Sequence, residues 1–221
     1  MLFTLSQQNH SIMKYAHFFF ALTLSVMSLA QNELKPVRLL AAKLPAGIKY
    51  TGKIKEAVRY TDSLGDNIVV TTETGETPNK SYPTDARDAA LYAYRYEING
   101  DSVKRIWRVY DFIENCPLDI EASFIENTFS ITDLNKNGVA EVWLMYTTVC
   151  HGDVSASTMK VIMYEGTQKF AMRGRNKVRI TETRYDGGEY TFDLAFSNGP
   201  KEFRDFALKL WNQNLKPRWE R

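Results

Sequence analysis

Hydrophobic and polar positions alternate along much of this chain, which is the period of a half-buried β-strand. The clearest alternation covers residues 89–98, where an aromatic ring recurs at every second position: Tyr92, Tyr94 and Tyr96. An Asn-Gly pair at 99–100 follows, and it is a strong hairpin signal because both residue types tolerate positive φ. Residues 103–113 are expected to return antiparallel to the first strand.

Further strands are expected on both sides of this hairpin. Runs of β-branched or alternating residues indicate them at 66–73, 124–132, 139–149, 158–165, 168–173 and 177–184. Gly166-Thr167 and residues 174–176 mark tight turns, and such short connections favour antiparallel neighbours. The polar residues 74–86 include two prolines and are expected to form a long exposed loop.

Near the C-terminus the period changes to that of a helix. Pro200 suits the first turn of a helix. Apolar residues then recur at helical spacing on one face: Phe203, Phe206, Ala207, Leu210 and Trp211. The sequence therefore predicts an α+β fold, a predominantly antiparallel, twisted β-meander with a C-terminal amphipathic helix docked on the sheet.

The first thirty residues have the features of a secretory signal peptide. Met13-Lys14 opens a short positive region, residues 15–29 form an apolar run, and Ser28-Leu29-Ala30 places small residues where a signal peptidase cleaves. We therefore expect a signal peptide over 1–30, read naturally from Met13, and a single β-rich domain over 31–221. The alternative is an uncleaved membrane anchor, although the run is shorter than the roughly 20 apolar residues of a spanning helix.

Such a leader predicts a periplasmic or extracellular protein that meets a membrane only through its signal peptide. The chain has 221 residues, 28 basic and 26 acidic side chains and a formal net charge of +2. This balance argues against a nucleic-acid partner bound by bulk electrostatics. Removal of the leader leaves His151 as the only histidine. A zinc site of two or three histidines is thereby excluded, and any Ser-His-acid mechanism must use His151.

The two cysteines, Cys116 and Cys150, are expected to pair, because an even count in an oxidising compartment favours a disulfide. The alternatives are two separate buried thiols, or a metal site that adds His151 to both sulfurs. The second alternative is disfavoured because the adjacent ligands Cys150 and His151 would strain a tetrahedral site.

The segment 133–141 has the ligand spacing of a calcium loop. Oxygen-bearing side chains stand at positions 1, 3, 5 and 9, Gly138 allows the sharp turn at position 6, and position 7 offers a backbone carbonyl. The expected ligands are Asp133, Asn135, Asn137, Val139 and Glu141. The loop resembles those of integrin-type (FG-GAP) repeats, and it departs from the EF-hand because Leu144 occupies position 12. We expect weak binding, with a Kd of about 10⁻⁴–10⁻³ M. The alternative is a polar hairpin loop whose side chains bond their own backbone.

Two further segments offer candidate chemistry. In Cys150–Ser155, His151 and Asp153 invite a catalytic interpretation as a general base and its acid. The alternative is a turn after a strand, since no nucleophile-elbow motif is present. Among the acids Asp111, Glu114, Asp119 and Glu121, a pair suited to glycoside hydrolysis would need the right separation, which sequence does not give.

An aromatic face is a candidate ligand-binding surface. If the hairpin loop at 99–100 has two residues, Tyr92 faces Trp107, and the four rings Tyr92, Tyr94, Tyr96 and Trp107 share one side of the sheet. Such rings stack on sugars; the alternative is that they form one core face. A longer loop would shift this register. The opposite side, with Arg95 and Glu97, is expected to be solvated.

Several motifs taken together resemble a family of exported bacterial proteins of surface polysaccharide biosynthesis: CPLD, ITDLNKNGVAEVWLMY, CHGDVS, TMKVIMYEG and KFAMRG. The resemblance covers roughly residues 85–215 and implies a cell-envelope protein linked to lipopolysaccharide or capsule assembly, with no catalytic residue to carry over. We therefore expect a non-enzymatic accessory or binding role, with a glycan or an envelope protein as partner. The alternatives are a calcium-stabilised protein-interaction module and an exported hydrolase that uses His151.

Overall fold

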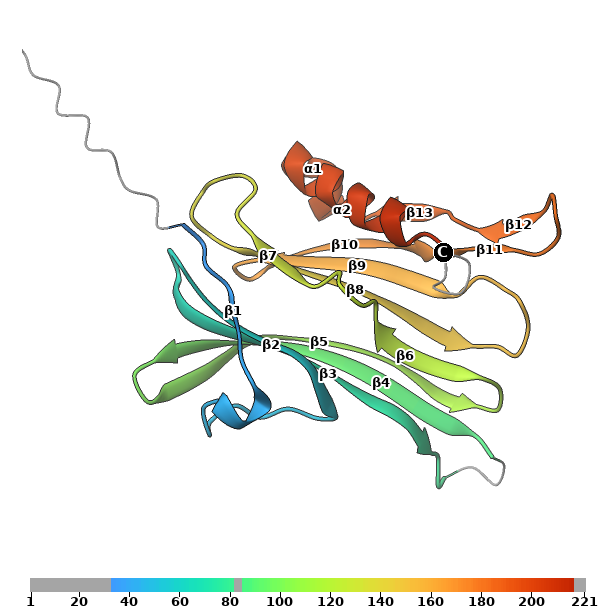
Figure 1. Cartoon of the computed structure of the whole chain (residues 1–221), viewed down its shortest axis with the longest axis horizontal. Coiled ribbons are helices and arrows are strands. Elements are labelled where there is room, and N and C mark those ends of the chain that lie inside the picture. Colours follow the sequence, from blue (N-terminus) through green and yellow to red (C-terminus); the bar gives the residue numbers. More distant parts are fainter. Residues whose placement is uncertain (1–32, 82–84, 217–221) are drawn as a thin grey trace, which may run out of the picture. The chain divides into compact units, whose positions relative to one another are not determined.

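Two antiparallel β-sheets carry most of the chain in the computed structural model, which describes residues 33–81 and 85–216 (Figure 1). These residues fall within one compact unit, Asn32–Arg221. The predicted signal peptide lies outside the described residues. Within the described part, no helix has both the length and the apolar character needed to cross a membrane.

The first sheet, called sheet A here, follows the chain order β1-β2-β3-β4-β5. Its strands are β1 (Val37–Arg38), β2 (Lys53–Asp62), β3 (Gly65–Pro78), β4 (Arg87–Asn99) and β5 (Ser102–Cys116). A short 3-10 helix, η1 (Ala41–Lys43), lies between β1 and β2. Sheet A is therefore a meander of successive hairpins, as the sequence predicts.

The second sheet, sheet B, has the order β13-β10-β9-β8-β6, and β7 also pairs with β8. Its strands are β6 (Ile120–Phe124), β7 (Ser130–Thr132), β8 (Glu141–Cys150), β9 (Thr158–Glu165), β10 (Gln168–Arg175) and β13 (Tyr190–Phe192). A small separate hairpin joins β11 (Lys177–Arg179) to β12 (Tyr185–Gly187). Two helices follow, α1 (Leu194–Asn198) and α2 (Lys201–Asn214).

Three hydrophobic clusters define the layers. The cluster between the sheets combines residues such as Val69 and Leu91 of sheet A with Leu144 and Ile162 of sheet B. A second cluster lies on the other face of sheet B, where Trp143 and its neighbours pack against α1 and α2 (Figure 1). A third covers the outer face of sheet A, on which the segment before β2 packs. The predicted docking of the C-terminal helix on the sheet is confirmed.

The apolar spacing of α2 explains this docking. Phe203, Ala207, Leu210 and Trp211 are its buried residues, and they occupy one face of the helix. Pro200 precedes the first helical residue, as expected from its preference for helix starts. The helix packs on residues of β8, β9 and β10, and no residue of β6 belongs to the same hydrophobic cluster.

Several strand boundaries differ from the sequence prediction. β2 has no counterpart among the predicted strands, and β3 runs on to Pro78 into the segment expected to be a loop. Its polar end still pairs with β4, as Thr77 with Asp88, after a register shift. The predicted strand 124–132 is split into β6 and β7 by a turn in which Asn127 has positive φ (61°). The predicted strand 177–184 stops at Arg179.

The register of the β4–β5 hairpin also corrects the prediction. The two-residue turn is Gly100-Asp101 rather than Asn99-Gly100, because Asn99 pairs with Ser102. A bulge between Arg95 and Tyr96 then shifts the pairing again, so that Trp107 lies opposite Arg95 and Tyr92 lies opposite Tyr110. Trp107 therefore points between the sheets, whereas the three tyrosines share the outer face of sheet A. Arg95, expected to be solvated, is only 4% exposed, because its face of the sheet is covered by sheet B.

Candidate functional site

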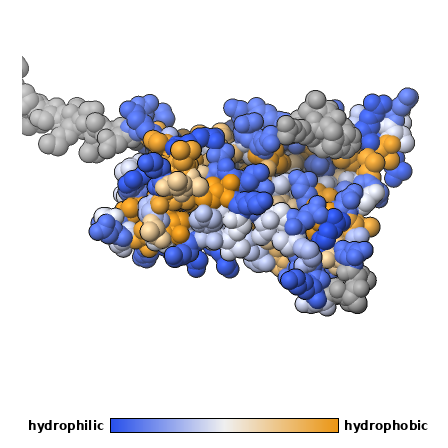
Figure 2. All heavy atoms as spheres, turned by 60° about the horizontal axis from the view of Figure 1, so that its bottom comes forward, coloured by the Kyte–Doolittle hydropathy of each residue, from blue (hydrophilic) through white to orange (hydrophobic). Residues whose placement is uncertain are grey.

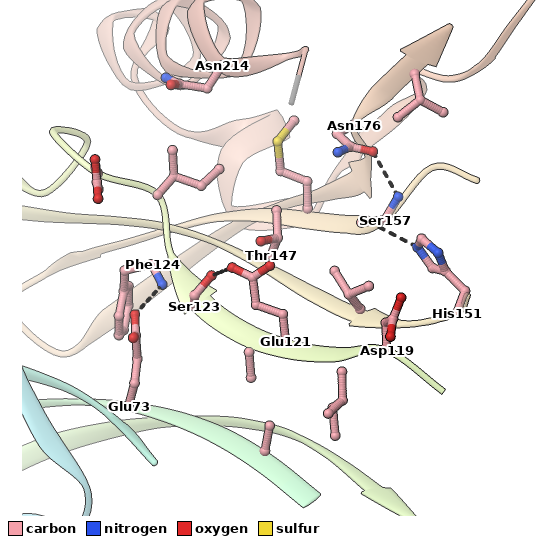
Figure 3. Close-up of a pocket in the computed structure, with 18 of the residues that line it drawn as sticks. Glu73, Asp119, Glu121, Ser123, Phe124, Thr147, His151, Ser157, Asn176 and Asn214 are labelled. Carbon is pink, nitrogen blue, oxygen red and sulfur yellow. Dashed lines mark hydrogen bonds between the residues drawn. The ribbon is translucent and has the colours of Figure 1, made fainter. Parts of the chain in front are cut away.

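A groove of about 990 Å³ lies along β6, where helix α2 no longer covers sheet B (Figure 3). β6 pairs with β8 alone, and its alternation places Ile120 and Ala122 inward while Glu121 and Ser123 take the other face. Thr147 lies beside Ser123 across the ladder. Polar groups thus occupy the part of the sheet that α2 leaves open.

The wall toward sheet A contains an ion pair that also caps the edge strand. Glu73 of β3 accepts a hydrogen bond from the Phe124 backbone N–H at 2.8 Å, and Lys55 lies 3.2 Å from the same carboxylate. The groove wall carries more acids than bases. The acids are Glu73, Glu76, Asp119, Glu121, Glu126 and Asp153, and the bases are Lys55, Lys216 and His151. Such a surface disfavours phosphate-rich ligands and favours neutral or cationic ones.

His151 stands at the far end of this groove, directly after β8. Its backbone N–H donates to the Asp119 carbonyl oxygen at 3.1 Å. Its Nδ1 lies 3.1 Å from the carbonyl oxygen of Asp153, and its Nε2 lies 3.2 Å from Ser157 Oγ (Figure 3). The Asp153 carboxylate is 3.5 Å from Nδ1, and its side chain is 75% exposed. The structure therefore brings His151 and Asp153 together, as the sequence suggests, and adds Ser157, which the sequence analysis did not single out.

Ser157 is held by Asn176 at the start of the β11–β12 hairpin. The Ser157 backbone N–H donates to Asn176 Oδ1 at 2.8 Å, and the Asn176 N–H donates to the Ser157 carbonyl oxygen at 3.0 Å. Gly187 of β12 passes close by with φ +76°, and a Cβ there would lie 2.0 Å from the Asn176 carbonyl oxygen. A glycine is needed at 187 to let the hairpin approach this closely.

The cysteines form the predicted disulfide beside the groove. Cys116 and Cys150 are joined, 34 residues apart in sequence, and no free cysteine is present among the described residues. The bond ties the end of sheet A to the end of β8, one residue before His151. This finding excludes both the two-thiol and the thiolate-metal alternatives.

The predicted calcium loop lies at the other end of β8. The ten-residue strand β8 runs from Glu141 to Cys150, a span of roughly 30 Å. The loop and His151 therefore do not share a pocket, and neither Asp133 nor Glu141 lines the groove. Each candidate must be judged separately.

The loop has the internal hydrogen bonds of a side-chain-braced turn. Asp133 Oδ2 accepts from the Gly138 N–H at 3.1 Å, while Asn135 Oδ1 and Asn137 Oδ1 accept from the backbone N–H groups two residues later at 3.2 and 2.8 Å. Lys136 and Gly138 adopt positive φ. The other carboxylate oxygen of Asp133 is buried without a hydrogen-bond partner among the described residues. A buried carboxylate oxygen that lacks a hydrogen-bond donor is a suitable ligand for a cation.

Glu141 is fully buried, and its carboxylate is hydrogen-bonded within the protein. Its carboxylate accepts from Thr132 Oγ1 at 2.6 Å and from the Leu134 N–H at 2.9 Å. Burial raises the pKa of the Glu141 carboxyl above its ordinary value, partly offset by these hydrogen bonds. Glu165, opposite Glu141 on β9, accepts at 2.7 Å from the side-chain amides of both loop asparagines. The pattern of the loop alone could not reveal Glu165.

The oxygen atoms of the loop are of the kind that bind calcium, and most of them belong to uncharged groups. Asp133, Asn135, Asn137 and the Val139 carbonyl would hold the ion, and the carboxylate of Glu141 would add negative charge to the ligand set. Within the described ranges, no group of three or more His, Cys, Asp or Glu side chains is placed to hold a metal ion. Hard oxygen ligands of this kind with few charges correspond to weak binding.

The aromatic row on sheet A is only partly accessible. Tyr94 and Tyr96 are each 3% exposed, and their hydroxyls bond to the Thr51 N–H and the Lys49 carbonyl oxygen, so they fix the segment before β2. The stack continues through Tyr92 to Tyr110 and Phe112, with ring centroids 4.8 and 4.7 Å apart. Figure 2 shows that hydrophobic atoms on this side of the molecule are broken up by hydrophilic ones. The most accessible rings of this row are Tyr110 and Phe112, 42% and 44% exposed, which the sequence pattern did not single out.

The acids considered for glycoside hydrolysis divide between sites. Asp119 and Glu121 line the groove, whereas Asp111 forms an ion pair with Lys160 and Glu114 lies exposed on β5.

Comparison with known proteins gives no relative for this chain: no family model, no curated protein and no solved structure matches it.

Proposed function

We propose that this chain is an exported cell-envelope protein that binds a surface polysaccharide, lipopolysaccharide or capsule, and supports its assembly as an accessory or binding protein. The observation that carries the proposal is the open polar groove along β6. The motif string that resembles exported proteins of surface polysaccharide biosynthesis supports the same assignment.

The groove offers the groups that recognise sugar hydroxyls. Each hydroxyl is both a donor and an acceptor, so it is best met by carboxylates, amides and hydroxyls placed side by side. Glu121, Ser123 and Thr147 supply such a set on adjacent positions of β6 and β8, and Phe124 adds an apolar surface at the end of the strand. A volume of about 990 Å³ is at the upper limit of ordinary small-molecule pockets, which suits several sugar units.

The charge of the groove indicates which part of the polysaccharide it would bind. Its excess of carboxylates repels the phosphates of a lipid-anchored core. The proposal therefore concerns neutral or amino-bearing repeat units. The Cys116–Cys150 disulfide supports maturation outside the cytoplasm, since disulfides persist in oxidising compartments.

Affinity electrophoresis of residues 31–221 through gels that contain the producing cell's own lipopolysaccharide or capsule tests this proposal. We expect retardation of the native chain and loss of retardation in the double variant Glu121→Gln, Ser123→Ala. Glu114→Gln is the matched control, because Glu114 is an exposed acid of sheet A that does not line the groove. Equal mobility of the native chain with and without polysaccharide would refute binding.

Deletion of the gene tests the link to assembly in the cell. We expect an altered lipopolysaccharide ladder or altered lectin staining of the surface. An unchanged ladder together with unchanged staining counts against the proposed role.

The buried, unpartnered oxygen of Asp133 favours a second candidate, a calcium-stabilised interaction module. In this role the ion would fix the loop that precedes β8, and a protein partner would bind the ordered surface.

A further inference from the structure

The turn after β8 holds a serine and a histidine in the arrangement of a nucleophile and its base. Ser157 Oγ lies 3.2 Å from His151 Nε2, and both residues line the groove along β6. His151 is partly exposed, with 26% of its side-chain surface accessible. A ligand in the groove can therefore reach both atoms.

The contact of His151 Nδ1 indicates which tautomer the imidazole ring adopts. His151 Nδ1 lies 3.1 Å from the Asp153 carbonyl oxygen, which can only accept a hydrogen bond. The proton of a neutral ring is therefore on Nδ1, and Nε2 presents its lone pair to the Ser157 hydroxyl. This is the tautomer that a general base needs, and a backbone carbonyl orients the ring in place of the usual buried acid.

Asn176 holds the backbone of Ser157 in place. The Asn176 side-chain oxygen accepts from the Ser157 N–H at 2.8 Å (Figure 3). This contact fixes the serine beside the His151 ring.

From this geometry we propose that Ser157 and His151 form a hydrolytic pair that cleaves short-chain O-acyl esters of polyhydroxylated alcohols. Ser157 Oγ attacks the ester carbonyl carbon and gives its proton to His151 Nε2. The C–O bond to the alcohol breaks, the alcohol leaves with that proton, and the acyl group stays on Ser157. Water then loses a proton to His151, attacks the acyl carbon and releases the carboxylic acid, and Ser157 regains its proton.

Three features of the site favour this substrate class. The acidic wall, including Asp119, Glu121 and Asp153, favours neutral substrates and expels an anionic carboxylate product. An ester releases its alcohol more readily than an amide releases its amine, which suits a pair whose acid, Asp153, is exposed rather than buried. The hydroxyl and carboxylate groups along β6 would contact the alcohol part. This activity goes beyond the proposed binding role and does not depend on it, because the reaction needs no polysaccharide.

The test uses residues 31–221 with p-nitrophenyl acetate and with a fully acetylated monosaccharide, and it follows nitrophenol and acetate release. We expect Ser157→Ala and His151→Gln each to lower kcat/KM at least about 100-fold, the usual contribution of a nucleophile–base pair. Ser102→Ala, at an exposed serine of the β4–β5 hairpin, serves as the matched control and should keep full activity. Circular dichroism of each variant establishes that it is folded.

Covalent labelling provides a second, independent measurement. Diisopropyl fluorophosphate should add to Ser157, as located by peptide mass spectrometry, and His151→Gln should suppress the labelling. Turnover equal in the native chain and in His151→Gln, or an absence of label on Ser157, would overturn the proposal. Either result leaves the polysaccharide-binding test unaffected.

Discussion

Arg95 of β4 donates a hydrogen bond from Nη1 to the carbonyl oxygen of Gly166 at 2.8 Å, which joins sheet A to the β9–β10 turn of sheet B. Its Nε donates to Asn67 Oδ1 at 3.0 Å, and Asn67 Nδ2 in turn donates to Asp62 at 3.2 Å. Asp62 also accepts from the Ala140 N–H at 2.9 Å. A polar chain thus crosses the space between the sheets and ends at the start of β8.

Arg95→Leu is expected to lower the free energy of unfolding by about 2–4 kcal/mol, because it leaves the buried Asn67 Oδ1 and the partly buried Gly166 carbonyl oxygen without their donor. Urea unfolding followed by tryptophan fluorescence measures the loss. Arg108→Leu is the control. Arg108 is exposed, and its guanidinium lies 5.6 Å from the centre of the Tyr110 ring in a cation–π pair worth up to about 1 kcal/mol. Equal effects of the two substitutions would contradict the role of the buried chain.

Removal of the disulfide by Cys116→Ala with Cys150→Ala is expected to cost about 4 kcal/mol of unfolding free energy. The cause is the entropy that the unfolded chain regains when a loop of this length is opened. Denaturant titration of the native and double-variant proteins measures the difference. The native protein under reducing conditions should match the double variant, and a variant as stable as the oxidised native chain would refute the expectation.

The raised pKa of Glu141 predicts a specific pH dependence. Its folded-state pKa lies above the unfolded value, so the native state keeps the proton to higher pH than the unfolded state does. The contribution of Glu141 to stability is therefore greatest at low pH, and it falls as the pH rises from the ordinary glutamate value through the folded-state pKa. The limiting slope is about 1.4 kcal/mol per pH unit.

Unfolding free energies measured from pH 4 to 7 in the presence of EDTA test this point. Glu141→Gln should lose this part of the pH dependence, and Glu114→Gln, which removes an exposed carboxylate elsewhere, should keep it. Parallel pH profiles for the native chain and Glu141→Gln would show that the group does not titrate as expected.

Calcium binding at residues 133–141 predicts a rise in melting temperature. At a calcium concentration ten times the Kd, binding to the folded state adds about 1.4 kcal/mol of stability. Differential scanning fluorimetry in 10 mM CaCl₂ and in EDTA measures the shift. Asp133→Ala should abolish it, whereas Asp101→Ala, in the Gly100-Asp101 turn, should not. Equal melting temperatures of the native chain in the two buffers would refute calcium binding at this loop.

The sequence pattern predicts most of the long strands and the final helix because both have a clear period, although it misses β2. It does not predict how the strands divide into two sheets, since alternation shows that a face is buried but not what buries it. Arg95 illustrates the limit: a charged residue at an alternating position suggests solvent, and only the packing of sheet B on that face shows otherwise. The predicted β4–β5 register is wrong because the turn lies one residue later than Asn99-Gly100 and because the bulge at Arg95/Tyr96 has no local signal.

The candidate sites show the same limit. His151 and Asp153 could be selected by residue type, and Ser157 became a candidate only when the turn placed its hydroxyl beside the ring. Glu165 is 24 residues from Glu141 in the sequence and lies opposite it only through the pairing of β8 with β9. Contacts of this kind depend on register, and a single sequence does not give the register.

The order in which the chain visits the two sheets has a consequence for its biogenesis. All strands of sheet A precede all strands of sheet B, and the chain passes between them at residues 117–119. Because the chain is made with its N-terminus first, sheet A has every one of its strands before β8 is available. One apolar face of that sheet, which includes Val69 and Leu91, then lacks its cover. A chaperone that shields exposed strands would act during this interval.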